Sequence, residues 1–258
     1  MNPGPMPDPT RRFSSRVDDY IKHRPGYPPA IIELLQQKCG LTPASVVADV
    51  GSGTGIWSKS LLEGGARVFA VEPNREMREA AERLLKNFGG FTSVAATAEA
   101  TTLPDQSVDL VTAAQAFHWF DRGKTRAEFA RILKPGGWIA LLWNDRRSDS
   151  TPFLRAYEQL LRAHATDYAQ VDHKHMDDSV IGSFFAPAAF QLEVFENQQS
   201  FDLAGLKGRL LSSSYAPEAG HPKHEAMIRE LESIYAAHQR NGQVVFEYDT
   251  KVYFGRLG

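Results

Sequence analysis

The stretch from Val46 to Trp57 reads VVADVGSGTGIW and decides the fold. Apart from one aspartate, its first five residues are β-formers in a short apolar run, as expected of a parallel strand covered on both faces. Three glycines follow at alternate positions, Gly51, Gly53 and Gly55. A short helix is predicted next, over residues 56–63, and a pair of glycines closes it. Strand, glycine turn and helix in this order suit a nucleotide, because glycines let the backbone approach a ligand closely.

Three kinds of ligand loop compete for this stretch. A nicotinamide dinucleotide loop has G-x-G-x-x-G, but the sixth position counted from Gly51 is Ile56. A P-loop has G-x-x-x-x-G-K-[ST], and counting from Gly53 places Ser58 where the second glycine belongs. The pattern acid-x-G-x-G-x-G matches in full over residues 49–55. A tight glycine turn that binds no ligand is the remaining alternative.

The third pattern resembles motif I of the class I S-adenosylmethionine (SAM) dependent methyltransferases. The resemblance implies SAM as the cofactor, with its adenosine and methionine tail against the bare backbone of Gly51, Ser52, Gly53 and Gly55. Because SAM has no phosphate, the loop need not bind an anion. A carboxylate at Asp49 suits the ammonium group of the tail.

A second acidic residue follows the glycine loop. Residues 66–72 read as the second strand, and Glu72 ends it, 23 residues after Asp49. A carboxylate there can accept hydrogen bonds from both vicinal ribose hydroxyls. A dehydrogenase would use the same acid, so Glu72 indicates an adenosine ligand without choosing which. The resemblance adds Pro73 and Met77, at the start of the next helix, to the cofactor site.

Two later segments complete the predicted site. After a third strand over residues 91–96, the resemblance places Ala98 and Glu99 against the adenine. At the end of a fourth strand, which should run to Ala113, it places Gln115 beside the methionyl part of SAM, with His118 and Trp119 near the transferred methyl. His118 could be a general base, since an imidazole titrates near neutrality. The alternative is a histidine that only packs or hydrogen-bonds beside aromatic residues.

Two flanking motifs strengthen the resemblance. The segment from Tyr20 to Tyr27, YIKHRPGY, is similar to the lead-in of small-molecule methyltransferases related to the trans-aconitate and quinone-biosynthesis enzymes. In those enzymes the tyrosine and arginine lie over the methionine end of the cofactor, which implies this role for Tyr20 and Arg24. The run RILKPGGW at 131–138 resembles the R-x-L-K-P-G-G signature that precedes the fifth strand. The helix before it should begin after the cap Asp121, with Ala127, Ala130 and Leu133 facing inward.

We therefore expect a single α/β domain over residues 1–258. The resemblance implies a Rossmann-like, doubly wound, seven-stranded and mainly parallel sheet, in the order 3-2-1-4-5-7-6 with the last strand antiparallel. We expect the fifth strand at Trp138 to Trp143 and a disordered tail over residues 1–12. Helical segments at 146–186 and 203–222 should cap the active-site crevice.

Composition excludes several functions. The formal net charge of the 258 residues is −2, so no overall basic field recruits nucleic acid. No apolar run approaches the roughly 20 residues of a membrane span, and the proline-rich N-terminus lacks a signal-peptide core. Cys39 is the only cysteine, which excludes an internal disulfide. We expect a cytoplasmic monomer or homodimer without a metal, and we interpret the run from His173 to Asp178 as a solvated loop.

The predicted function is transfer of the sulfonium methyl of SAM to a small-molecule carboxylate, phenol or enolic carbon. Two alternatives remain: an NAD(P)-dependent oxidoreductase on a Rossmann fold, and a SAM-binding protein without turnover. The acceptor pocket should form where three distant segments meet above the sheet, namely Tyr20 with Arg24, His118 with Trp119, and Ser214 with Tyr215.

Overall fold

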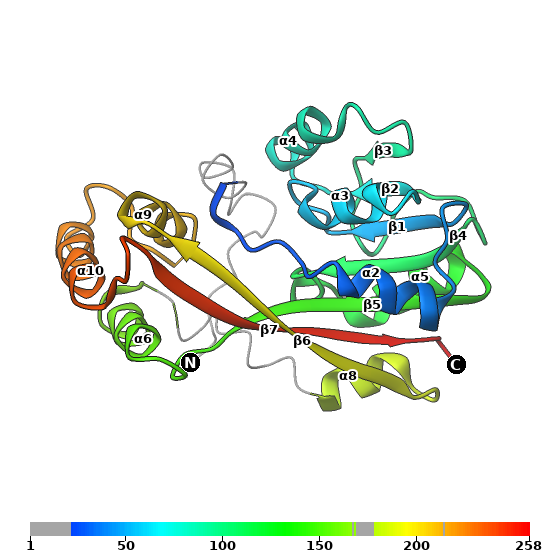
Figure 1. The fold of residues 1–258 in the computed structure, drawn as a ribbon. Helices are drawn as coiled ribbons and strands as arrows, with labels where there is room; N and C mark the ends of the chain where they lie inside the picture. Colours follow the sequence, from blue (N-terminus) through cyan, green and yellow to red (C-terminus); the bar gives the residue numbers. More distant parts are fainter. Residues whose placement is uncertain (1–21, 167, 169–177, 214) are drawn as a thin grey trace, which may run out of the picture.

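Seven strands form one sheet in the order β3-β2-β1-β4-β5-β7-β6 (Figure 1). The computed structural model describes residues 22–166, 168, 178–213 and 215–258. Strands β1 to β5 pair in parallel, whereas β7 is antiparallel to both β5 and β6, which confirms the predicted fold class. The strands are β1 Val46–Val50, β2 Arg67–Val71, β3 Phe91–Val94, β4 Val108–Ala114, β5 Leu133–Arg146, β6 Phe190–Phe201 and β7 Val244–Gly255.

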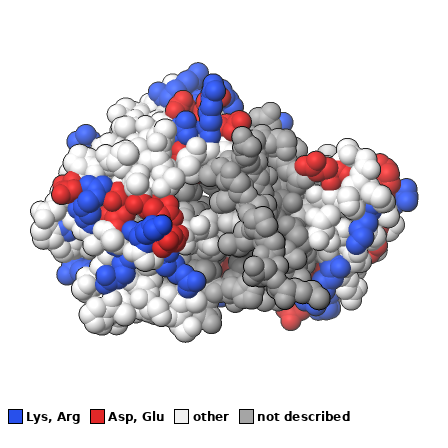
Figure 2. Space-filling view, turned by 180° about the vertical axis from the view of Figure 1, so that it is seen from behind, with Lys and Arg blue, Asp and Glu red and all other residues white. Residues whose placement is uncertain are grey.

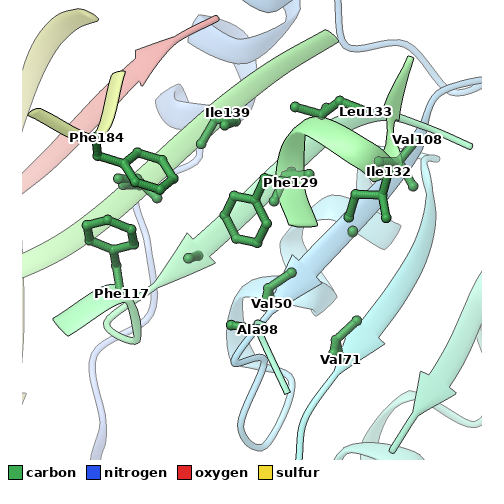
Figure 3. Close-up of a cluster of buried hydrophobic side chains, with 14 of the residues drawn as sticks. Val50, Val71, Ala98, Val108, Phe117, Phe129, Ile132, Leu133, Ile139 and Phe184 are labelled. Atoms are coloured by element: carbon green, nitrogen blue, oxygen red, sulfur yellow. The ribbon is translucent and has the colours of Figure 1, made fainter. Parts of the chain in front are cut away.

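Helices cover both faces of the parallel part of the sheet. On one face, α2 (Ala30–Cys39), α3 (Ile56–Glu63) and the end of α4 (Arg75–Leu85) pack on β1, β2 and β5. On the other face, α5 (Arg122–Ile132) and α8 (Asp178–Phe185) enclose an apolar cluster that includes Phe117, Phe129 and Phe184 (Figure 3). This double cover explains why β1 and β4 read as nearly continuous apolar runs.

The inward face of α5 differs from the prediction. Leu133 is buried as predicted, but it begins β5 rather than ending the helix. Ala127 and Ala130 are exposed, and Phe129 is fully buried instead. The reason is that Glu128 also faces inward, where its Oε1 accepts hydrogen bonds from the Thr101 amide at 2.7 Å and the Thr101 hydroxyl at 2.5 Å. A polar residue on the buried side breaks the apolar spacing from which the face was predicted. The predicted cap is correct, since Asp121 accepts from the Lys124 amide.

The fifth strand is longer than predicted. Its pairing with β4 shifts where Val108 pairs with Leu133 and Leu110 pairs with Trp138, so the intervening glycine-rich residues leave the ladder. At its other end β5 continues past Trp143 because it pairs with β7 as far as Arg146. Antiparallel pairing with a later strand thus sets this boundary.

Strands β6 and β7 join the sheet to a separate group of helices. They pair along their whole lengths and extend beyond the parallel strands (Figure 1). Phe246 and Tyr248 of β7 there lie in an apolar core with Tyr157, Leu206 and Leu231. We call the helices around this core the helical lobe: α6 (Pro152–His164), α9 (Leu203–Leu211) and α10 (His224–His238).

The surface has no marked charge segregation on the face shown in Figure 2, where acidic and basic side chains are interspersed among the described residues. Among the described helices, none combines the length and apolar character needed to cross a membrane.

Candidate active site

A cavity of about 1010 Å³ opens at the carboxyl ends of β1 and β4. The chain runs outward from β1 through β2 to β3 and then returns to β4 beside β1, so these ends form the switch point where open α/β sheets bind ligands. Residues of the helical lobe, among them Glu158 and Arg209, line the same cavity. One wall therefore belongs to the sheet and the other to the helical lobe.

The glycine loop after β1 forms the floor of the cavity. Gly51 and Gly53 both line it, and both have positive φ, +69° and +55°. A Cβ on Gly51 would lie 2.5 Å from the Cβ of Ala116, so no larger residue fits there. A Cβ on Gly53 would approach only the Sδ of Met77, at 3.5 Å. The space over Gly53 is therefore available to a ligand.

Glu72 is fixed in position by the backbone of the loop. Its Oε2 accepts from the Gly53 amide at 2.9 Å, and its Oε1 accepts from the Asn74 amide at 2.8 Å. Burial raises the pKa of this carboxyl, although both amides favour the charged form. Each oxygen keeps lone pairs for a further donor. Glu72 can therefore hold two neighbouring hydroxyls while it holds the loop.

Asp49 is more enclosed than the sequence indicated. Its side chain is fully buried, and its oxygens accept from the hydroxyls of Ser58 at 2.6 Å and Thr112 at 3.1 Å. Burial raises the pKa of Asp49 to about 6, and the negative charge of Glu72 adds to the effect. The carboxylate therefore joins β1 to α3 and β4, in addition to lining the cavity.

The remaining predicted cofactor residues divide into two groups. Ser52, Pro73, Met77, Ala98 and Glu99 all line the cavity. Gly55 does not: a Cβ there would lie 2.7 Å from the Cδ1 of Leu85 in α4. Its φ of +84° and this close approach show that the packing of α3 against α4 by itself requires a glycine at this position.

The segment after β4 forms a second edge of the cavity. Gln115 has φ of +57°, a conformation that is uncommon for a residue with a side chain and that is found at functional sites. Its backbone amide donates to the Leu142 carbonyl at 2.9 Å, which holds this turn against β5. His118 and Trp119 follow in a short 3-10 helix, η2 (Phe117–Trp119), with ring centroids 4.7 Å apart, and both line the cavity.

Arg24 reaches the cavity because polar side chains of the sheet hold the segment that carries it. The Gly26 carbonyl accepts from Asn144 of β5 at 3.2 Å and from Asn197 of β6 at 2.9 Å. The Arg24 guanidinium in turn donates to the Ser212 carbonyl at the end of α9, at 3.0 Å. The structure thus brings Arg24, His118, Trp119 and Tyr215 to one cavity. Tyr20 and Ser214, predicted for the same pocket, lie outside the described residues.

Sequence reasoning missed the charged and phenolic residues on the wall formed by the helical lobe. Arg146 from the end of β5, Arg209 from α9 and Tyr248 from β7 all line the cavity. No motif marks them, but Arg209 has one signal: it shares the buried stripe of α9 with Leu206 and Leu210, where a charge is unexpected.

No group of three or more potential metal ligands occurs among the described residues. Of the run from His173 to Asp178, interpreted above as a loop, residues 173–177 lie outside them, and Asp178 is not in a loop because it begins α8.

Comparison with known proteins agrees with this geometry. Residues 48–141 match the family model described as "Methyltransferase domain". An uncharacterized methyltransferase of Schizosaccharomyces pombe is 35% identical over 152 residues, which cover 58% of this chain and 59% of that protein. An uncharacterized methyltransferase of Mycobacterium tuberculosis is 40% identical over 136 residues, 52% of each chain. The chain thus spans little more than half the length of these relatives.

Solved structures resemble the fold over nearly its whole length. A protein of Anaeromyxobacter dehalogenans described as a type II methyltransferase superposes with a TM-score of 0.65 at 26% identity, covering 90% of this chain and 97% of that one. A SAM-dependent methyltransferase of Geobacter sulfurreducens, in complex with S-adenosyl-L-homocysteine, has a TM-score of 0.56 at 16% identity, covering 97% and 100%.

The strand order, the antiparallel β7 and the glycine loop fixed by Glu72 define a Rossmann-like methyltransferase fold. With the match over residues 48–141, they make this part of the chain similar to the class I SAM-dependent methyltransferases.

Proposed function

We propose that the protein uses SAM to methylate a small-molecule acceptor in this cavity. The observation that carries the proposal is Glu72, a buried carboxylate. One of its oxygens accepts from the Gly53 amide in the glycine loop and the other from the Asn74 amide at the start of α4, and together they keep capacity for two ribose hydroxyls. The open space over Gly53 suits the body of the nucleoside. Bound SAM would supply a methyl group already activated by the positive charge on its sulfur.

The resemblance to SAM-dependent methyltransferases suggests roles for the surrounding residues. The proposal assigns Ala98 and Glu99 to the adenine and Gln115 and Arg24 to the methionine end, and it is supported by the presence of all four in the cavity wall. Arg24 suits the carboxylate of SAM because a guanidinium offers two parallel donors. Its donation to Ser212 also ties the cofactor end of the cavity to α9.

The chain's main catalytic task is to align the acceptor and exclude water. Residues 146–186 and 203–222 are proposed as the cap, supported by the presence of Glu158, Arg209 and Tyr215 in the cavity wall. A carboxylate acceptor needs no base. A phenol or an enolic carbon needs one, and His118 is the candidate, since it lines the cavity beside Trp119.

Calorimetric titration with SAM, beside fluorescence titration with NADH, tests the cofactor. We expect SAM to bind and NADH not to bind, and the reverse result would favour an oxidoreductase. A screen of carboxylic acids, phenols and quinone precursors, read as S-adenosylhomocysteine release, then tests turnover. SAM binding without release on any acceptor would favour a binding protein.

A further inference from the structure

Arg209 is a buried cation without a carboxylate partner among the described residues. Its side chain belongs to a residue only 6% exposed, and it lines the cavity. Its Nη1 contacts the Ser213 hydroxyl at 3.1 Å, and its guanidinium lies over the Phe246 ring, 5.9 Å from the centroid. The Nε has no hydrogen-bond partner within the described part of the chain. A buried charge in this state is costly unless something pairs with it.

The neighbouring acid does not neutralise Arg209, because other groups already occupy it. Glu158 accepts from Arg146 at 2.5 Å, from Arg162 at 3.0 Å and from the Tyr168 hydroxyl at 2.8 Å. Arg146 itself still has a buried Nη1 without a partner among the described residues. This wall of the cavity therefore has guanidinium donors in excess of carboxylate acceptors.

The other acids around the cavity are also engaged or lie elsewhere. Asp145 pairs with Lys251 at 2.8 Å. Asp178 lies near Lys251 and Tyr253, where its negative charge helps to raise the pKa of both side chains. These four residues come from β5, α8 and β7, and within the described part of the chain none of them forms an ion pair with Arg209. The wall that carries Arg209 also carries tyrosines. Tyr168 and Tyr215 stack edge to face there, with centroids 5.0 Å apart.

We propose that Arg209 binds a carboxylate of the methyl acceptor, which is therefore an organic acid anchored on the wall formed by the helical lobe. This inference rests on the proposed function and names the substrate class for the same cavity. A carboxylate suits the site because its two oxygens match the parallel donors of a guanidinium. The tyrosine wall beside it suits a planar or apolar body.

The anchored carboxylate is not the group that receives the methyl. Methylation would turn it into a neutral ester and leave the guanidinium of Arg209 buried and unpaired again. The charge of Arg209 instead positions the acceptor, so that a second, nucleophilic group of the same molecule faces the methyl donor. This separates the residue that selects the acceptor from those that contact SAM.

Binding of matched probes tests the proposal. Benzoate, 4-hydroxybenzoate, cinnamate and succinate are titrated calorimetrically into the protein, with and without S-adenosylhomocysteine, beside benzamide, 4-hydroxybenzamide, cinnamamide and succinamide. We expect at least one acid to bind about ten- to hundredfold more tightly than its amide, as for one charge-assisted contact. If no acid is preferred over its amide in the wild-type protein, the proposal is wrong.

Variants then assign the effect to Arg209. Arg209→Gln should abolish the preference for acid over amide while the S-adenosylhomocysteine affinity stays within about twofold, and Arg209→Lys should restore part of the preference. Arg162→Gln is the matched control, because this arginine also pairs with Glu158 but is 66% exposed and does not line the cavity. The Arg162→Gln variant should prefer acid over amide as strongly as the wild-type protein does.

The outcomes separate the two proposals. An acid preference that survives Arg209→Gln overturns the role of Arg209, whatever the cofactor does. Failure of S-adenosylhomocysteine to bind the wild-type protein would count against the proposed function, and the titrations without it would still decide for or against Arg209.

Discussion

Replacing Glu72 with alanine tests the central contact of the proposed cofactor site. The variant removes the acceptors of two backbone amides, those of Gly53 at 2.9 Å and Asn74 at 2.8 Å. Leaving such donors unsatisfied costs about 1–3 kcal/mol of unfolding free energy. The same change removes the charged acceptors for the ribose hydroxyls, which is expected to weaken SAM binding by about 1.5–3 kcal/mol, or ten- to hundredfold.

Two measurements separate these effects. Urea unfolding gives the stability of the variant, and calorimetric titration with SAM at a temperature where it is folded gives the affinity. Thr151→Ala is the matched control: it removes the hydroxyl that caps α6 by accepting from the Leu154 amide, at a cost of about 1 kcal/mol. Thr151 does not line the cavity, so affinity should not change. A folded Glu72→Ala variant with wild-type affinity would remove Glu72 from the site.

Three further predictions use other residues of the same region. Gly53→Val should abolish SAM binding because the valine side chain would fill the open space over the loop. Gly55→Ala, whose Cβ would lie 2.7 Å from Leu85, should instead lower the unfolding free energy by about 1–3 kcal/mol and leave the SAM affinity of the folded protein unchanged. Calorimetric titration and urea unfolding of both variants check this contrast. Burial raises the pKa of Asp49 from 3.8 to about 6, so Asp49 ionises in the unfolded chain at a lower pH than in the folded protein. Its stabilising contribution is therefore lost as the pH rises from 3.8 to about 6. Asp49→Asn should flatten this dependence of the unfolding free energy on pH, and parallel wild-type and variant curves would contradict the prediction. Arg24→Ala should raise the SAM dissociation constant in the absence of acceptor, and a change confined to the acceptor KM would show that Arg24 binds the acceptor instead.

The sequence predicted those parts of the site that depend on a few adjacent residues. The glycine loop and Glu72 were predictable because strand, turn and acid follow one another closely, and each has a chemical requirement that few residue types meet. The strand order followed from the resemblance, and the structure confirms it. The role of Gly55 was not predictable, because its constraint comes from Leu85 on the next helix.

Other features depend on contacts between distant parts of the chain. The end of β5 at Arg146 is set by pairing with Tyr248, about a hundred residues later. The inward face of α5 is set by the hydrogen bonds between Glu128 and Thr101. Arg209 reaches the cavity only because α9 packs on β7, and its one signal, a charge on the apolar stripe of α9, does not say which cavity it faces.

Strand β7 has a consequence for how the molecule unfolds. Phe246 and Tyr248 lie in the core of the helical lobe, whereas Val252 and Phe254, on the same side of the same strand, lie in the core beneath α2 and α3. Thr250 stands between them and donates to Asn144. Two hydrophobic cores therefore share one continuous ladder, and we expect the opening of one core to loosen the backbone pairing next to the other. Amide hydrogen exchange should accordingly give similar protection at both ends of β7, as in a single cooperative unit.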